Sequence, residues 1–250
     1  MTGPGRRVLL QAGVGVALVA LACSALLGLL TTWWFGAILL AWTVLALTFV
    51  VAMRVRVAED RALRFVGPTR PAGEVGLDDA GANPSAEARL LNLVEGLAPN
   101  AGIPRPRCLV IDDAALNALT LGRDARHGCL IVTSGLLDAL TRIELEAVVA
   151  SGLVSLRSGA AAPSTLAIAL TGAGSLLHRA IARSAGPRPI DLEAVALTRY
   201  PPGLLAALRV VAAGGPKAPA VASVALAPLW FGPPGDEEAI ARRIAALDEL

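Results

Sequence analysis

Few side chains in this sequence are of the types that carry out catalysis, and their spacing limits what they can do. The chain has two His residues, His127 and His178, and no Cys-x-x-Cys pair or Cys/His cluster, which excludes a structural zinc site of that kind. Ser151 and Ser155 lie one helical turn apart in an apolar stretch, so a helix would place them on one face. No Gly-x-Ser-x-Gly turn surrounds them and no local pattern supplies a His or Lys to activate them, so we do not predict a serine hydrolase.

The three cysteines are far apart in the chain. Cys23 lies in an apolar run and is expected to be buried. Cys108 and Cys129 fall on two expected strands, where a disulfide is one alternative. Free, buried thiols are the prediction if this region faces a reducing cytoplasm.

The elements around these residues predict an α+β fold with a small sheet and mainly helical surroundings. Residues 57–84 are expected to form a linker, because 66–84 are rich in Gly, Pro and Asp. A helix is predicted from Ser85, as its N-cap. Strands are predicted at 107–111 and 128–133, with a loop between them.

Two helices are predicted after the second strand. The first covers 136–140, and the second starts near Thr141, where Thr141 and Glu144 match a capping box. A terminal helix is predicted from Asp236, with acidic residues in its first turn and an apolar stripe that docks on the domain. Residues 85–250 are therefore interpreted as one domain.

The N-terminal part has the composition of a membrane anchor. The whole chain is 55% hydrophobic and 17% charged, against about 25% charged in soluble domains. Val8–Leu30 and Trp34–Met53 are uncharged runs long enough to cross a bilayer, so residues 1–56 are predicted to form a two-helix transmembrane hairpin. A cleaved signal peptide is disfavoured by the length of the first run and by the second run that follows it.

The distribution of Arg predicts the orientation of this anchor. Arg residues precede the first run and follow the second, and the turn between them has none. By the positive-inside rule the main domain is expected in the cytoplasm. A third uncharged stretch, 158–177, contains Pro and Gly, so we expect a segment in or against the membrane, or a buried helix, in preference to a third span.

Four segments in order resemble the HtpX-type membrane zinc metallopeptidases. The resemblance is carried by the strand and loop Ile111–Asp113, Asn117–Leu119 and Gly122–Asp124, by Val132–Leu137, which is similar to VTxGLL, by Glu144–Ala150, similar to ELEAVIA, and by Ala196–Leu204. It covers 85–160 well and 187–210 in part.

In that family two His of HExxH and a Glu on a later helix hold zinc, and the Glu of the motif is the general base. The resemblance places the two His positions at Ser151 and Ser155, the base at Gly152 and the third ligand at Pro187. The nearby Asp of the family is kept as Asp191. No zinc cofactor is therefore expected, and the chain is interpreted as a degenerate, inactive member. The alternative is an active metalloendopeptidase whose ligands come from His127, His178, Asp191 and Glu193.

The resemblance also indicates a binding role. The edge strand and cleft that hold an extended peptide in active members would still bind one by strand addition, with Asn117, Ala118 and Leu119 as contacts. The expected partners are the membrane and another membrane protein or an extended peptide, with a binding or regulatory role in membrane protein assembly or quality control. The net charge of +2 gives no reason to expect a nucleic acid. Heavy use of Ala, Gly, Arg and Pro suggests a bacterial, GC-rich genome, and hence a multi-pass protein of the bacterial inner membrane.

Overall fold

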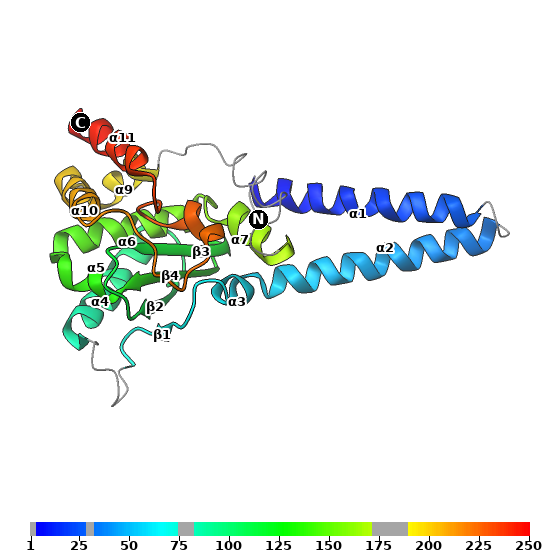
Figure 1. Ribbon diagram of the computed structural model, residues 1–250, viewed down its shortest axis with the longest axis horizontal. Helices are drawn as coiled ribbons and strands as arrows, with labels where there is room; N and C mark the ends of the chain where they lie inside the picture. The colour runs from blue at the N-terminus through cyan, green and yellow to red at the C-terminus, as the bar shows by residue number, and fades with distance from the viewer. Residues whose placement is uncertain (1–3, 29–32, 75–82, 172–189) are drawn as a thin grey trace.

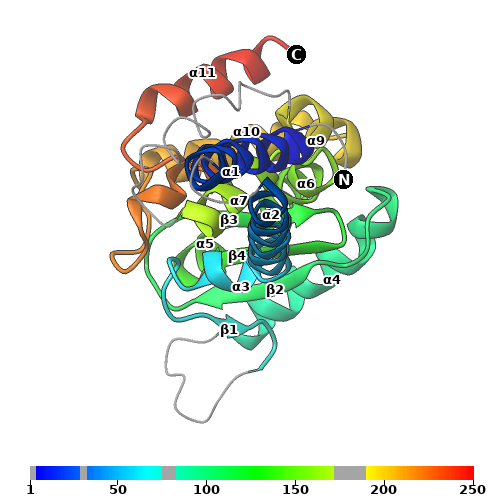
Figure 2. The same ribbon diagram turned by 90° about the vertical axis from the view of Figure 1, so that its right-hand side faces the viewer.

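The computed structural model describes residues 4–28, 33–74, 83–171 and 190–250. A helical hairpin projects from one end of an α+β body (Figure 1). The hairpin consists of α1 (Pro4–Gly28) and α2 (Trp33–Arg56), which lie side by side in both views (Figures 1 and 2). The α+β fold class with a small sheet is confirmed.

One helix in the described part of the chain, Trp34–Arg56, is long and apolar enough to cross a membrane, and it corresponds to the second predicted span. The first predicted span falls in α1, of which Gly13–Leu26 forms a shorter apolar helix. Along α2 large apolar side chains face outward, for example Trp42 and Phe49, each 65% exposed. Exposure of this kind over a whole helix is expected where lipid replaces water.

The segment after α2 is more structured than the expected linker. It forms α3 (Ala58–Leu63) and a short strand, β1 (Arg70–Pro71), before residues 75–82, which lie outside the described part. Ala62 is fully buried, and Arg70 forms an ion pair with the buried carboxylate of Glu87 at 2.5 Å. Burial and this ion pair hold the segment against the domain, which its loop-like composition did not predict.

The sheet has four strands in the order β1-β2-β4-β3. β2 (Arg107–Ile111) is parallel to β4 (His127–Thr133), and β3 (Ala118–Asp124) is antiparallel to β4. The strands at β2 and β4 were predicted. The prediction of a loop between them was wrong in part, because Ala118–Asp124 in its second half form β3. The turn-forming residues of that stretch lie at the end of β3, while its apolar residues pair with β4.

Helices cover one face of the sheet through α4 (Pro84–Asn100), α5 (Ser134–Ala139) and α6 (Arg142–Arg157). The capping box of Thr141 and Glu144 is confirmed at the start of α6. The N-cap of α4 is Asn83 and not Ser85, because the Asn83 side chain accepts the Ala86 N–H and Pro84 takes the first helical position.

The opposite face is covered by α7 (Ala162–Thr171), which lies between the sheet and the base of the hairpin (Figure 1). Its residues from 162 to 169 are buried, so the described part of the third apolar stretch is a buried helix, and 172–177 lie outside the described residues. Arg54 and Arg61 donate to the carbonyls of Leu170 and Ala169 at its C-terminal end. The Arg54 contact joins the hairpin to the domain, and the Arg61 contact joins α3 to the same end of α7.

The C-terminal part adds α9 (Ile190–Thr198), α10 (Pro201–Ala213), the 3-10 helix η1 (Val224–Leu229) and α11 (Glu237–Asp248). α11 docks on the domain as expected: Ile240 and Leu247 are buried. Arg209 of α10 pairs with Asp248 at 3.0 Å.

All three cysteines are free. Cys108 faces the helical layer of α4 and α6, whereas Cys129 faces the layer that contains α7. Side chains on opposite faces of a sheet cannot form a disulfide, even though β2 and β4 are neighbours. The prediction of buried thiols is confirmed for these two, while Cys23 is exposed on α1.

Candidate functional site

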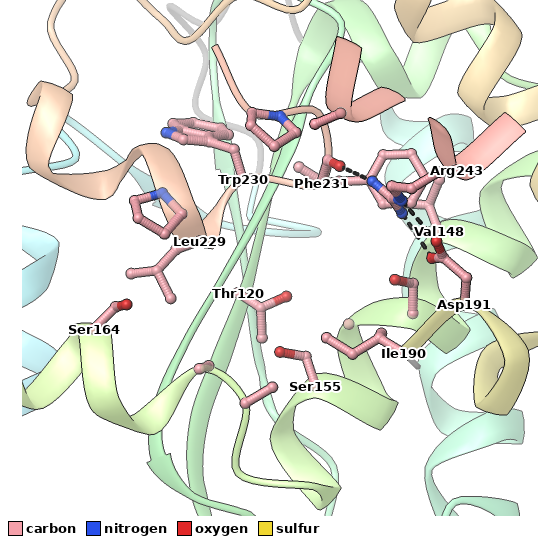
Figure 3. A pocket seen from close by; sticks show the side chains of 18 of the residues that line it. Thr120, Val148, Ser155, Ser164, Ile190, Asp191, Leu229, Trp230, Phe231 and Arg243 are labelled. Atoms are coloured by element: carbon pink, nitrogen blue, oxygen red, sulfur yellow. Dashed lines mark hydrogen bonds and ion pairs between the residues drawn. The ribbon is translucent and has the colours of Figure 1, made fainter. Parts of the chain in front are cut away.

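A cleft of about 720 Å³ lies beside the outer edge of β3. Its floor is formed by β3 and α6, and its walls by α7, α9, the segment before α11 and α11 itself (Figure 3). Most of its lining is apolar. Its charged side chains, Asp191, Arg242 and Arg243, are each paired. The cleft is therefore close to neutral.

Three of the four positions that the sequence resemblance assigned to catalytic residues face this cleft from α6: Ser151, Gly152 and Ser155. Ser151 is buried, with 7% of its surface exposed. A Cβ atom at Gly152 would lie 2.8 Å from Leu130 Cδ1 and 3.1 Å from Thr120 Oγ1. Side chains of two neighbouring strands thus lie close to the position that the resemblance assigned to the general base. The fourth position, Pro187, lies outside the described residues.

Asp191 reaches the cleft from α9 but is held by Arg243 of α11. The guanidinium donates to both carboxylate oxygens, at 2.7 and 2.8 Å, and also to the carbonyl of Phe231. It lies over the Phe231 ring, 4.8 Å from the centroid. A bidentate pair of this kind fixes both partners. The ion pair of Arg243 and Asp191 therefore forms this wall of the cleft, and both oxygens of the carboxylate are engaged by the guanidinium.

The alternative metal ligands are not brought together in the described part of the chain. His127 bonds to Asp124 at 2.8 Å in the turn between β3 and β4, and Glu193 pairs with Arg157 at 2.7 Å. Burial alone would raise the pKa of Asp124, but hydrogen bonds from His127 and from backbone N–H groups lower it. His178 lies outside the described residues.

These residues do not fit the zinc ion that an HtpX-type site holds. Two neutral hydroxyls are poor ligands compared with imidazole. Among the described residues no group of three His, Cys, Asp or Glu side chains could hold a metal.

The predicted peptide contacts Asn117, Ala118 and Leu119 are buried, with at most 2% of their surface exposed. The Asn117 amide donates to the carbonyls of Gly232 (2.6 Å) and Lys217 (3.0 Å), and accepts the N–H of Gly232 at 2.9 Å. Asn117 therefore binds the chain's own C-terminal part.

Residues 229–232, here called the edge segment, lie along the outer edge of β3. The Phe231 N–H donates to the Ala118 carbonyl at 2.7 Å, and Trp230 forms an antiparallel bridge with Leu119. Farther along β3, the Gly122 N–H donates to Thr165 Oγ1 of α7 at 3.2 Å. Alternate residues of a strand point their backbone groups to the same side. Thr120, which lines the cleft, thus lies between two covered positions of this edge.

Sequence reasoning missed Thr120, Trp230, Phe231 and Arg243 as site residues. Thr120 was hidden in the supposed loop. The tail residues are more than one hundred positions from β3, and no spacing pattern connects them. The one available signal was an aromatic pair followed by Gly-Pro-Pro, which is unusual in a terminal linker.

Curated relatives resemble part of this chain. The Protease HtpX homolog of Dictyoglomus thermophilum is 41% identical over 95 residues, which is 38% of this chain and 31% of that protein. The protein of the same name in Acidiphilium cryptum is 41% identical over 92 residues, which is 37% of this chain and 32% of that protein. That of Levilactobacillus brevis is 37% identical over 93 residues (37% and 31%). The matched segment is HtpX-like.

This similarity confirms the resemblance to the HtpX-type family that the sequence motifs indicated. The matched segment covers about a third of the length of the curated relatives. No protein-family profile matches the chain. Together with α2, the similarity identifies a membrane-associated relative of the HtpX-type metallopeptidases.

Proposed function

We propose that this protein is an HtpX-type relative without peptidase activity, which binds an extended segment of another protein in the cleft beside β3. The observation that carries the proposal is the packing of Gly152 against Leu130 and Thr120. By the family resemblance a general base would need a carboxylate at this point of α6, and its Cβ would press on the Leu130 methyl and the Thr120 hydroxyl. The packing around position 152 therefore supports the proposed loss of the base.

The remaining chemistry of the cleft supports binding without cleavage. Ser151 and Ser155 offer neutral hydroxyls, and the carboxylate of Asp191 is neutralised by Arg243. Zinc-dependent hydrolysis requires a tightly held ion that activates water. The apolar lining and the strand edge at Thr120, which lines the cleft, suit the side chain and main chain of an extended peptide.

A membrane anchor would keep this cleft close to other membrane proteins. We infer that the domain is cytoplasmic, in a bacterial inner membrane, because Arg residues flank both outer ends of the hairpin. Arg123 also donates to the carbonyls of Val55 and Arg56, at 2.8 and 2.9 Å, where α2 ends.

A C-terminal fluorescent-protein fusion is expected to fluoresce and a C-terminal alkaline-phosphatase fusion to be inactive. The reverse pattern would place the domain on the other side.

A paired assay tests the proposed function. The protein in mild detergent is incubated with casein and zinc to detect cleavage, and a fluorescent apolar peptide reports binding by anisotropy. We expect no cleavage above a buffer control, while an HtpX protease prepared in the same way cleaves. We expect peptide binding that Ser155→Phe, which fills the cleft, abolishes. Ser85→Phe, the same substitution at an exposed site on α4, should leave binding unchanged.

Two results would contradict the proposal. Zinc-dependent cleavage by the wild-type protein would favour the active metallopeptidase with unusual ligands. Equal peptide binding by the Ser155→Phe variant would show that the cleft is not the binding site.

A further inference from the structure

The edge segment makes the contacts that an added peptide strand would make. Its main chain pairs with β3 at Ala118 and Leu119 in antiparallel register. The side-chain amide of Asn117 donates to the carbonyl of Gly232 and accepts its N–H. Pro228 precedes it and Pro233 follows it. Because proline has no N–H, the ladder cannot continue in either direction.

The side chains of the edge segment also alternate as those of a strand do. Trp230 packs into the cluster that contains Leu119, whereas Phe231 packs on the other side, in the cluster that contains Ile240. Both are buried, with 4% and 9% of their surface exposed. The segment has no charged residue from position 228 to 234.

The same residues form a wall of the cleft. Trp230 and Phe231 lie on the side opposite Thr120 and Ser155 (Figure 3). If the edge segment left β3, the cleft and the strand edge would become one continuous groove, open from Asn117 to Thr120. In the observed state Ala118 and Thr120 line the cleft, while the edge segment covers the main chain of β3 at Ala118 and Leu119.

We infer that the edge segment is an internal ligand, and that the groove beneath it accepts uncharged extended segments with large apolar or aromatic side chains at successive positions. This inference rests on the proposed function and specifies its ligand class and its control. An incoming segment must replace the buried contacts of Trp230 and Phe231 as well as their hydrogen bonds. A polar peptide offers the hydrogen bonds alone and cannot displace the edge segment.

Gly232 allows the edge segment to be loosened without a substitution in β3 or α6. A Cβ atom there would lie 2.6 Å from Val211 Cγ1 and 3.3 Å from Ile240 Cδ1, both on the side of α10 and α11. Gly232→Ala should therefore push the segment off its anchor. The matched control is Gly96→Ala on α4, where an added Cβ meets no atom within 4 Å. Trp230→Ala removes a buried side chain of the edge segment and leaves β3 intact, so it serves if Gly232→Ala does not fold.

The test measures binding of a fluorescent peptide with the sequence of residues 227–234, Ala-Pro-Leu-Trp-Phe-Gly-Pro-Pro, to the full-length protein in detergent. A second peptide carries Ser in place of Trp and Phe. We expect at least tenfold tighter binding of the first peptide to Gly232→Ala than to the wild type or Gly96→Ala, and no gain for the Ser peptide. Limited proteolysis near Trp230 checks that the segment has been released.

Each other outcome overturns the inference in a different way. Equal binding to the wild type and Gly232→Ala, lost in Ser155→Phe, would leave the proposed function standing and show that the edge segment is no competitor. A gain that is the same for both peptides would refute the ligand class. Release of the segment without any binding of either peptide would refute both the inference and the proposed function.

Discussion

Replacing Gly152 by Ala tests whether the general-base position is closed. Ala in place of Gly within a helix is worth about 1 kcal/mol in helix propensity. Against this gain stands the new methyl group, 2.8 Å from Leu130 Cδ1 and 3.1 Å from Thr120 Oγ1. Overpacking of this kind costs about 1–3 kcal/mol. Gly152→Ala should therefore leave the free energy of unfolding unchanged at best, and lower it by about 2 kcal/mol at worst.

Gly96→Ala measures the propensity gain alone, because position 96 is exposed and open. It should raise the free energy of unfolding by about 1 kcal/mol, so the two variants should differ by about 1–3 kcal/mol. Pulse proteolysis across a urea series in mild detergent measures both. Equal stabilisation by the two substitutions would show that position 152 is open and would refute the packing argument.

A second substitution identifies the colliding atom. Leu130→Ala removes Cδ1 and should cost about 2–5 kcal/mol through the cavity that it leaves. In that background Gly152→Ala should no longer destabilise, because the new methyl group enters the cavity. The coupling energy between the two positions should be favourable; a value near zero would mean that Leu130 moves aside at no cost.

Three further predictions concern the fold around the cleft. Asn117→Ala should lower the free energy of unfolding by about 1–3 kcal/mol, because it leaves the buried N–H and C=O of Gly232 without the hydrogen bonds that Asn117 makes to them. The same urea series measures this loss, and an unchanged midpoint of unfolding would show that these hydrogen bonds contribute nothing to stability. Glu87→Ala should cost about 3 kcal/mol, because it removes the buried carboxylate partner of Arg70, while the more exposed Asp112 still pairs with Arg70 at 3.2 Å; a loss no larger than that of a surface variant would contradict the buried ion pair. Burial raises the pKa of Cys108 to about 11 and that of Cys129 to about 12; both thiols are neutral below these values, so at pH 8 a thiol reagent should modify them only after unfolding, as mass spectrometry can show, and rapid labelling of the native protein would be the contrary result.

Much of the fold followed from local patterns in the sequence. Apolar runs indicated the hairpin, and helical spacing with a capping box located α6 correctly. The predicted strands agree with β2 and β4 because both are continuous apolar runs bounded by polar residues. These signals lie within a single element, so no knowledge of the neighbours was needed.

The cleft could be predicted only in part, because its walls depend on contacts between distant parts of the chain. The positions on α6 followed from the family motif. The burial of Asn117, by contrast, arises from Gly232, which is more than one hundred residues away. The ion pair between Asp191 and Arg243 likewise joins two helices, and no pattern in either helix sequence indicates that they contact each other. The edge strand itself was mistaken for a loop because Gly122, Arg123 and Asp124 resemble turn residues.

The zinc content of the protein, purified in detergent and measured by elemental analysis, tests the central claim most directly. The account predicts less than about a tenth of an equivalent per chain, unresponsive to added zinc, because a high-affinity site needs ligands that are absent from the described cleft. The Ser151→His/Ser155→His variant, which restores two imidazoles on one face of α6, is the control and should retain more zinc. Close to one tightly held zinc per wild-type chain would contradict the account.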